Sequence, residues 1–420
     1  MAGNAGCASN PVGADCAAAM PSPNRRFAYS LVALCFLLAA VSRGLLDSFG
    51  AFVLPLGDAF GWERSEITLI YGCGMLAVGM SGPLVGLLHD RFGPGWTMAA
   101  GAAASGCGMF LAAIGSVPWH YQLGLGLLCG FGTAAMGAVT QAAMLSRWFR
   151  ADLNSALAIS YSGNGIGPML SLPLAQALIL ALGFRPAFGA LATMALVPLV
   201  ILAFLPWRRI RSGDPSLAET QASAGNGMTL SQALRDSVFW SLVWSFCLTS
   251  VGIYALTPQV VAFLIERGYP PLAAASAYGL AAMLVPVGMI GVGRLSDRGG
   301  RRLAVSVSYG LSIGGAALLS RVTDTGDDLL VGAFILCFGL TMGSRGPVIS
   351  TLVARRFAGS NLGRIYGSIT IGMGAGGALG AWSGGMLFDL TGGYGAIFVL
   401  SISAMAAGYV PFLWLTREPE

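Results

Sequence analysis

Long apolar segments separated by short polar turns recur along the whole chain. A membrane-spanning helix needs about 20 mainly apolar residues. Segments of that kind occupy about 27–55, 66–88, 95–115, 119–145, 155–180, 184–206, 236–265, 272–294, 302–321, 328–352, 364–387 and 393–415. The pattern predicts an all-α membrane protein with twelve transmembrane helices.

One long polar stretch, residues 207–235, separates the sixth apolar segment from the seventh. It predicts two six-helix bundles, 25–206 and 236–420, joined by a cytoplasmic linker. Residues 1–24 are rich in Ala, Gly, Asn and Pro, and they precede a pair of arginines without the pattern of a signal peptide. We expect them to form a disordered cytoplasmic tail.

Composition supports a membrane location, because 55% of the residues are hydrophobic, only 10% are charged, and the mean hydropathy is +0.73. Soluble domains carry roughly 25% charged residues. With both termini placed in the cytoplasm, most loop arginines fall on the cytoplasmic side, where positive charge accumulates. The opposite side holds Arg64, Arg185, Arg267 and Arg321. The net charge of +5 therefore reflects topology in the inner (plasma) membrane, and we expect no nucleic-acid partner.

Two short runs have nearly the same sequence 207 residues apart. Residues 86–93 read GLLHDRFG and residues 293–300 read GRLSDRGG. Each run follows an apolar segment and carries charges into a short loop. A duplicated charged loop of this kind indicates a transporter built from two related halves.

The shared Gly-x-x-x-Asp-Arg-x-Gly pattern, between the second and third helices and again between the eighth and ninth, resembles the signature loop of the major facilitator superfamily. The resemblance extends over about 25–415. It implies two bundles that rock about a central site. It also implies that the loops tie the halves together on the cytoplasmic side in one state and release them in the other. The gating residues would be Gly86, Asp90, Arg91, Asp297 and Arg298.

Three further stretches resemble the bacterial monocarboxylate-porter and oxalate/formate-antiporter branch of that superfamily. They are GAFVLPLGDAFGWERSEIT (50–68), SRGPVIS (344–350) and FDLTGGYGAIF (388–398). The chain departs from this branch in two ways: residues 285–293 of the eighth helix contain no basic residue, and the sequence contains no Lys. A dicarboxylate site with basic residues in helices 8 and 11 is therefore not expected.

Three ionisable residues lie well inside predicted spans: Arg43, Asp47 and Arg345. A charge at the centre of a membrane helix costs about 2.5–3.5 kcal/mol on insertion scales, so such residues usually face a cavity or a partner. Arg345 stands between small residues, and its planar guanidinium fits a carboxylate. It is predicted to anchor an anionic substrate. The alternative is an ion pair or a carbonyl cap that locks helix 10. The equivalent position in the first half is Gly137.

Arg43 and Asp47 are four residues apart and share one helical face. Asp47 is predicted to be the proton-coupling carboxylate and Arg43 a second contact for the anion. The alternative is that the two charges neutralise each other so that the helix can insert.

Uncharged polar residues on the helices near the predicted cavity complete the candidate substrate site. They are Gln141, Tyr161, Asn164, Tyr254 and Gln259. Each could instead form a hydrogen bond between helices. The run 163–168 fits GxxxGP, which resembles a motif of exchangers but is also a general device for close helix packing.

The sequence thus predicts a secondary active transporter that moves a small organic anion by alternating access, with proton symport or anion exchange. The family resemblance narrows the expected anion to a monocarboxylate. Two alternatives stay open: an exporter of a hydrophobic drug or metabolite, and a non-transporting membrane sensor. We find no catalytic set, cofactor motif or metal constellation, so an enzyme is not expected. The expected partners are the anion, protons and the lipid bilayer, with the chain as a monomer.

Overall fold

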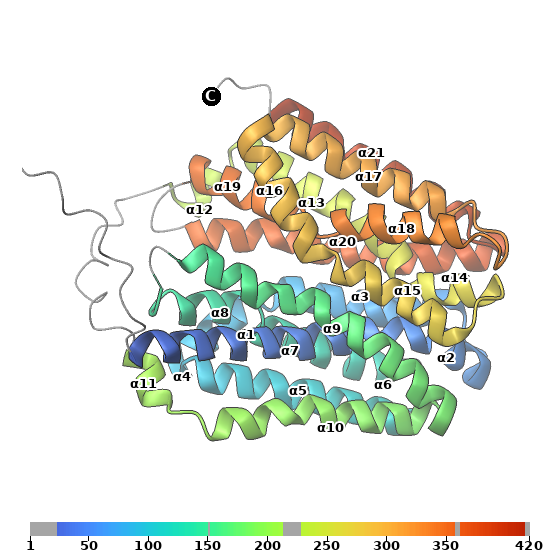
Figure 1. Cartoon of the computed structure of the whole chain (residues 1–420), viewed down its shortest axis with the longest axis horizontal. Helices are drawn as coiled ribbons and strands as arrows, with labels where there is room; N and C mark the ends of the chain where they lie inside the picture. The colour runs from blue at the N-terminus through green and yellow to red at the C-terminus, as the bar shows by residue number, and fades with distance from the viewer. Residues whose placement is uncertain (1–22, 150–151, 213–227, 358–361, 416–420) are drawn as a thin grey trace, which may run out of the picture.

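The computed structural model describes residues 23–149, 152–212, 228–357 and 362–415, which form helices running along one long axis (Figure 1). They group into twelve long segments, here called helices 1–12. Helices 1–6 are α1–η1–α2 (Pro23–Asp47, Ser48–Phe52, Val53–Phe60), α3–α4 (Arg64–Met80, Gly82–Phe92), α5 (Pro94–Ile114), α6–η2–α7–α8 (Pro118–Tyr121, Gln122–Leu128, Cys129–Met136, Ala138–Leu145), α9 (Leu153–Leu182) and α10 (Phe184–Ala203). Helices 7–12 are α13–η4–α14 (Ser237–Leu256, Thr257–Gln259, Val260–Glu266), α15–α16 (Pro271–Met283, Val285–Gly299), α17 (Arg301–Leu319), α18–α19 (Asp328–Thr341, Arg345–Arg356), α20 (Leu362–Thr391) and α21 (Gly395–Leu415).

These segments agree with the twelve predicted spans, with ends that differ by a few residues. Among the described residues, nine segments are long and apolar enough to cross a membrane, and a tenth is the pair α3–α4, bent by 51°. The predicted linker begins with the short helix α11 (Trp207–Ser212) and ends with α12 (Leu230–Ala233). The predicted tail, up to residue 22, and residues 213–227 of the linker lie outside the described residues.

The two halves, α1–α10 and α13–α21, lie side by side in Figure 1 and interrupt their helices at matching places. Helix 1 contains a 3₁₀ stretch at Ser48–Phe52, and helix 7 contains one at Thr257–Gln259. Helix 4 breaks at Gly137, and helix 10 breaks between Thr341 and Arg345. These breaks recur at nearly the same sequence offset as the duplicated loops, which confirms the pseudo-symmetric pair of bundles.

The last glycine of each duplicated loop has the same backbone conformation. Gly93 and Gly300 both have φ of +83°, with ψ of 173° and 151°. A residue with a Cβ is strained in this region of backbone conformation. Glycine is therefore required in the turn between helices 2 and 3 and in its copy between helices 8 and 9. This explains why the motif ends in glycine in both halves.

The halves contact each other closely toward one end of the molecule. We call this the far end, and the opposite end, which carries Asp90 and Asp297, the motif end. Near the far end, a Cβ on Gly385 would lie 2.7 Å from the Arg64 carbonyl oxygen, and farther along the same pair of helices one on Gly72 would lie 3.0 Å from the Ala378 carbonyl oxygen. These contacts bring α3 of the first half against α20 of the second.

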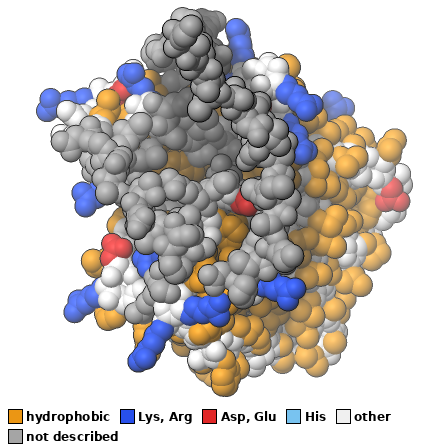
Figure 2. Space-filling model, turned by 60° about the vertical axis from the view of Figure 1, so that its left-hand side comes forward, with side chains coloured by type: hydrophobic (Ala, Val, Ile, Leu, Met, Phe, Trp, Pro, Cys, Tyr) orange, Lys and Arg blue, Asp and Glu red, His pale blue; other side chains and the backbone are white. Residues whose placement is uncertain are grey.

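Toward the motif end the described parts of the halves make fewer contacts, because α20 packs along α3 but has few or no contacts with α4. A Cβ added to Gly86, Gly293, Gly363 or Gly367 would meet nothing within 4 Å. Figure 2 looks toward this end and shows arginine side chains around it and hydrophobic side chains over the flank. Among the described residues, contacts between the halves therefore gather at the far end and in the middle of the molecule, and fewer are made at the motif end.

The GxxxG run of helix 5 packs α9 against α1. A Cβ on Gly163 would overlap the Phe36 carbonyl oxygen, and one on Gly167 would overlap that of Ala40. Small residues allow helix backbones to approach in this way in membranes. Close packing thus accounts for both glycines of the run.

Replacing Gly288 with alanine is expected to destabilise the fold, because the new Cβ would overlap the backbone carbonyl of Leu340 on α18. Overpacking of this kind costs about 1–3 kcal/mol, and here the obstacle is backbone. The measurement is thermal unfolding of the purified chain in detergent. Gly291→Ala, on the same helix with open space around the new Cβ, is the matched control. An unchanged melting temperature for Gly288→Ala would contradict the packing of α16 on α18.

Candidate functional site

Arg43 and Asp47 form an ion pair along one face of α1, as their spacing predicted. The Arg43 Nε donates to Asp47 Oδ2 over 2.8 Å. The side chains are 16% and 3% exposed. The pair lies next to the point where α1 gives way to the 3₁₀ stretch η1.

Two tyrosines from other helices complete this cluster. The Tyr71 hydroxyl, on α3, donates to Asp47 Oδ1 over 2.7 Å. Arg43 Nη2 donates to the Tyr254 hydroxyl, on α13 of the second half, over 3.4 Å. The rings of the two tyrosines have centroids 6.1 Å apart. We call Arg43, Asp47, Tyr71 and Tyr254 the interhalf cluster, because it joins side chains of both bundles.

The interhalf cluster is held by hydrogen bonds as well as by charge. Moving an ion pair out of water is costly, and its own attraction offsets that cost only when further hydrogen bonds satisfy both partners. Tyr71 supplies one to the carboxylate and Tyr254 accepts one from the guanidinium. Removing one charge from such a buried pair costs about 3–5 kcal/mol. Each charge is therefore available to a new partner only when the other is compensated.

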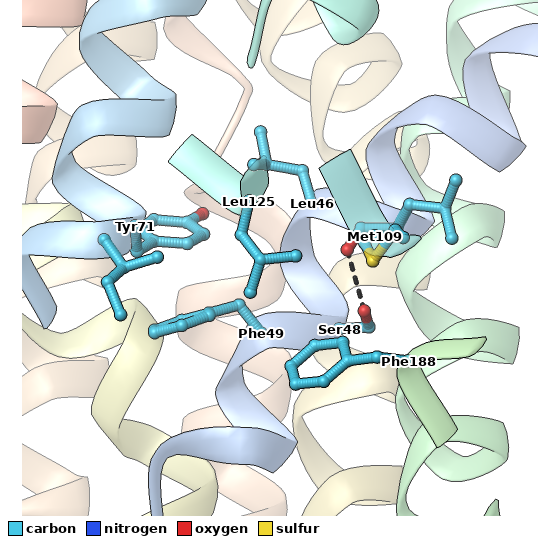
Figure 3. Close-up of a pocket in the computed structure, with 9 residues that line it drawn as sticks. Leu46, Ser48, Phe49, Tyr71, Met109, Leu125 and Phe188 are labelled. Carbon is cyan, nitrogen blue, oxygen red and sulfur yellow. Dashed lines mark hydrogen bonds between the residues drawn. The ribbon is translucent and has the colours of Figure 1, made fainter. Parts of the chain in front are cut away.

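A small apolar pocket lies beside the cluster, inside the first half (Figure 3). Tyr71 belongs both to its wall and to the cluster. The other lining residues are Leu45, Leu46, Ser48, Phe49, Ile70, Met109, Leu125 and Phe188. Ser48 turns its hydroxyl away to the Leu45 carbonyl, at 2.7 Å. The pocket therefore presents hydrocarbon next to the hydroxyl that binds Asp47.

Arg345 lies apart from the interhalf cluster, at the break in helix 10. It is 5% exposed. Its Nη2 donates to the Ser308 carbonyl over 3.2 Å and to the Ser312 hydroxyl, both on α17. Its guanidinium carbon lies 4.2 Å from the centroid of the Tyr309 ring. In this conformation Arg345 thus binds a carbonyl and a hydroxyl of helix 9, and its role as an anion anchor stays a prediction.

Two of the remaining predicted polar residues bond to neighbouring helices or backbone. Gln141 is buried and donates to the carbonyls of Cys35 and Met136 at 3.0 and 2.8 Å. The Tyr161 hydroxyl donates to the Ala138 carbonyl at 3.2 Å. The bonds to Met136 and Ala138, on either side of Gly137, brace the break of helix 4, and the bond to Cys35 joins helix 4 to helix 1.

The other two have different surroundings. Asn164 is exposed on α9. Gln259 is 1% exposed, and its amide has no hydrogen-bond partner among the described residues. Only Tyr254 of the five uncharged candidates contacts the Arg43–Asp47 pair within the described structure.

The predicted gating residues stand at the ends of α4 and α16. Asp90, Arg91, Asp297 and Arg298 are exposed at the motif end. They lie at the end where few contacts join α4 to α20, and their gating role stays a prediction.

The far end is joined by charges instead. The Arg64 guanidinium donates to Glu266 Oε1 over 2.6 Å. Asp389 accepts from the backbone N–H groups of Arg64 and Ser65, at 2.9 and 2.8 Å. We call these four residues the far-end bridge. Arg64 and Ser65 begin α3 in the first half, while Glu266 and Asp389 end helices of the second.

Sequence reasoning did not place Tyr71 or Tyr309 in a site. The sequence signal that could have pointed to Tyr71 is its position as a polar residue inside the predicted span 66–88. Tyr309 carried no signal, because its role depends on Arg345 lying over its ring. Among the described residues no group of three or more His, Cys, Asp or Glu could hold a metal ion.

Twelve long helices in two repeated halves, with buried opposite charges between them, define a multi-pass membrane transporter. The family model of the Major Facilitator Superfamily matches residues 32–357, and the chain belongs to that family. It is a secondary transporter and not an enzyme.

Curated relatives extend over nearly the whole chain. Monocarboxylate transporter 13 of Bos taurus is 28% identical over 390 residues, covering 92% of this chain and 88% of the relative. Monocarboxylate transporter 11 of Homo sapiens is 28% identical over 406 residues, covering 94% and 84%. The uncharacterized MFS-type transporter YhjX of Escherichia coli is 26% identical over 350 residues, covering 81% and 83%.

Solved structures share the fold. A D-xylose–proton symporter matches with a TM-score of 0.68 at 15% identity, covering 92% of this chain and 96% of the other. The nucleoside transporter NupG matches with a TM-score of 0.71 at 14% identity, covering 93% and 99%. At these identities the likeness supports the fold alone.

Proposed function

We propose that this transporter moves a small organic monocarboxylate, coupled to a proton or in exchange for another anion, and that the interhalf cluster is its substrate and coupling site. The observation that carries the proposal is the contact of Arg43 with both Asp47 and Tyr254. A guanidinium paired in one half and touching the other can respond to a ligand and to the relative position of the halves. The names of the monocarboxylate-transporter relatives support the substrate class.

The chemistry of the cluster is a competition for Arg43. A substrate carboxylate and the Asp47 carboxylate both prefer the same guanidinium. A proton on Asp47 weakens its hold on Arg43, and the guanidinium can then pair with the substrate. The loaded cluster carries one cation, one anion and one neutral acid, so it has the same net charge as the empty ion pair.

This neutrality matters for movement across the membrane. A negative-inside potential opposes entry of an anion by about 2.3 kcal/mol per charge per 100 mV. A proton entering with the anion cancels this term. We place the motif end in the cytoplasm, as the arginine distribution predicts, so that the closed far end faces outward in this conformation.

The experiment is uptake of labelled pyruvate, lactate and benzoate into proteoliposomes, with and without an inward proton gradient. Arg43→Gln is expected to lower the rate about 10–100-fold, because hydrogen bonds to charged groups contribute about 1.5–3 kcal/mol. Arg43→Lys keeps the charge and loses the planar fork, so we expect an intermediate rate. Arg267→Gln is the control, since Arg267 lies over Phe263 of its own half.

Uptake of the three acids that is indistinguishable from empty liposomes would contradict the proposed substrate class. Uptake that Arg43→Gln leaves unchanged would contradict the proposed site. Transport of a neutral hydrophobic compound by both wild type and Arg43→Gln would favour the exporter instead.

A further inference from the structure

The guanidinium of Arg345 is buried without a described counterion. Its partners are a carbonyl, a hydroxyl and an aromatic ring, all uncharged. Its Nε has no hydrogen-bond partner in the part of the chain that the structure describes. Burying a charge without an opposite charge costs several kcal/mol even after the protein relaxes. An anion that binds beside Arg345 during transport would offset this desolvation cost.

The backbone beside Arg345 also favours an anion. α19 is 12 residues long and begins at Arg345. The Ser344 hydroxyl donates to the Thr341 carbonyl over 3.1 Å and does not cap the new helix. The N-terminus of a helix carries a partial positive charge, and here that charge adds to the charge of the guanidinium.

Hydroxyl groups and open space surround the same point. Ser308 and Ser344 share a hydrogen bond of 2.7 Å, and Ser312 donates to Thr341 over 2.7 Å. A Cβ on Gly346, the next residue after Arg345, would meet nothing within 4 Å. The first turn of α19 therefore has room beside it for an added group at Gly346.

The repeat places this point at a different depth from the interhalf cluster. Arg345 corresponds to Gly137 of helix 4. On that helix Thr133 bonds to the Ser42 carbonyl and Gln141 to the Cys35 carbonyl, so Gly137 lies level with the middle of 35–42. At about 1.5 Å per residue, this level is roughly 7 Å closer to the motif end than Arg43. A substrate entering from the motif end would reach it first.

We propose that Arg345 and the first turn of α19 form a second carboxylate-binding site in the second half, separate from Arg43. The proposal rests on the proposed function for the identity of the ligand, a monocarboxylate. Binding moves Arg345 Nε into a hydrogen bond that it lacks in this structure and gives the buried cation its counterion. The Ser308 carbonyl and the Ser312 hydroxyl hold the guanidinium when no anion is present.

The test is thermal unfolding of the purified full chain, with sodium pyruvate and sodium benzoate as probes and sodium chloride at equal ionic strength as the reference. Ligand binding raises the melting temperature in proportion to occupancy. In the Arg43→Gln background, both probes are expected to raise it by roughly 2–4 °C. In Arg43→Gln/Arg345→Met, that rise should vanish.

The sign of the effect without ligand separates a binding role from a structural one. An unpaired buried charge destabilises, so Arg345→Met alone, in the absence of carboxylate, should unfold at the same or a higher temperature than wild type. A cation that serves only to cap the Ser308 carbonyl predicts a lower temperature. Arg345→Lys should keep part of the response to the probes.

Three results would overturn the second site: a lowered melting temperature for ligand-free Arg345→Met, no response to either probe in Arg43→Gln, or an equal response to chloride, which would indicate a halide site. The proposed function is tested separately, because it fails only if the wild-type protein shows no uptake of the labelled acids. Uptake that persists while the response assigned to Arg345 is absent would reject the second site alone.

Discussion

Replacing Asp47 with asparagine is expected to abolish proton-driven accumulation of substrate while preserving exchange of substrate across the membrane. The asparagine side chain can still accept a hydrogen bond from Arg43 and form one with the Tyr71 hydroxyl. Both hydrogen bonds that Asp47 makes in the structure can therefore be replaced. It cannot take up a proton. Arg43 would then lack a carboxylate competitor at every pH, and the anion would bind without the proton that normally accompanies it.

Two measurements in proteoliposomes separate these effects. With an inward proton gradient, net uptake of labelled pyruvate should fall about 100-fold, to the rate without a gradient. With equal unlabelled pyruvate on both sides, exchange should continue and should lose its dependence on pH. Binding and protonation are linked reciprocally, so substrate affinity in the wild type should rise as pH falls.

Asp58→Asn is the matched control, since Asp58 is exposed on α2 of the same helix. Gradient-driven accumulation by Asp47→Asn at the wild-type level would remove Asp47 from the coupling mechanism. Loss of both accumulation and exchange would mean that the Arg43–Asp47 pair serves folding, because the two charges neutralise each other so that the helix can insert.

Breaking the far-end bridge is expected to shift the protein toward a conformation that is open at the far end. Asp389 accepts two backbone N–H bonds at the start of α3, and hydrogen bonds to charged groups contribute about 1.5–3 kcal/mol. The Arg64–Glu266 pair adds less, about 0.2–1 kcal/mol, because Glu266 is 36% exposed. These contacts cross between the halves, so their loss weakens the closed far end relative to the open one.

For Asp389→Asn/Glu266→Gln we expect a change of about 2 kcal/mol, which is roughly a 30-fold change in the ratio of the two conformations. Pulsed electron paramagnetic resonance would measure it between spin labels at Ser116 and Thr325. Both residues are exposed in far-end loops, one in each half. The eight native cysteines would be replaced first.

Arg185→Gln serves as the control at the same end, since Arg185 lies over Phe60 and Phe184 within the first half. It should leave the distance distribution unchanged. A distribution for the double variant that matches wild type would mean that helix packing between α3 and α20, and not the far-end bridge, keeps this end closed.

The sequence predicted the Arg43–Asp47 pair because both residues lie on one helix, where a spacing of four residues determines the contact. It could not predict Tyr71 and Tyr254 as their partners. Those residues lie 24 and 211 positions from the atoms they bond, and local periodicity contains no information on contacts at such separations. Their meeting depends on how α3 and α13 pack against α1.

Arg345 illustrates the same limit in the opposite direction. Its charge within an apolar span was visible in the sequence, as was its lack of a counterpart at Gly137. The sequence did not show which neighbouring helix Arg345 faces. Helix 10 breaks between Thr341 and Arg345, so helical periodicity cannot be continued across the break. The tertiary structure turns the guanidinium toward α17, and this is what separates it from the interhalf cluster.

The sequence by itself determined the class of protein, the number of helices, the repeat and the identity of the buried charges. Each of these follows from hydrophobic length, from turn chemistry at Gly93 and Gly300, or from the cost of placing a charge in a membrane. The tertiary structure alone decided which charges meet, which end is closed and where helices 4 and 10 break. Those features arise from packing between helices distant in the chain, where small residues and shape, rather than any local pattern, set the contacts.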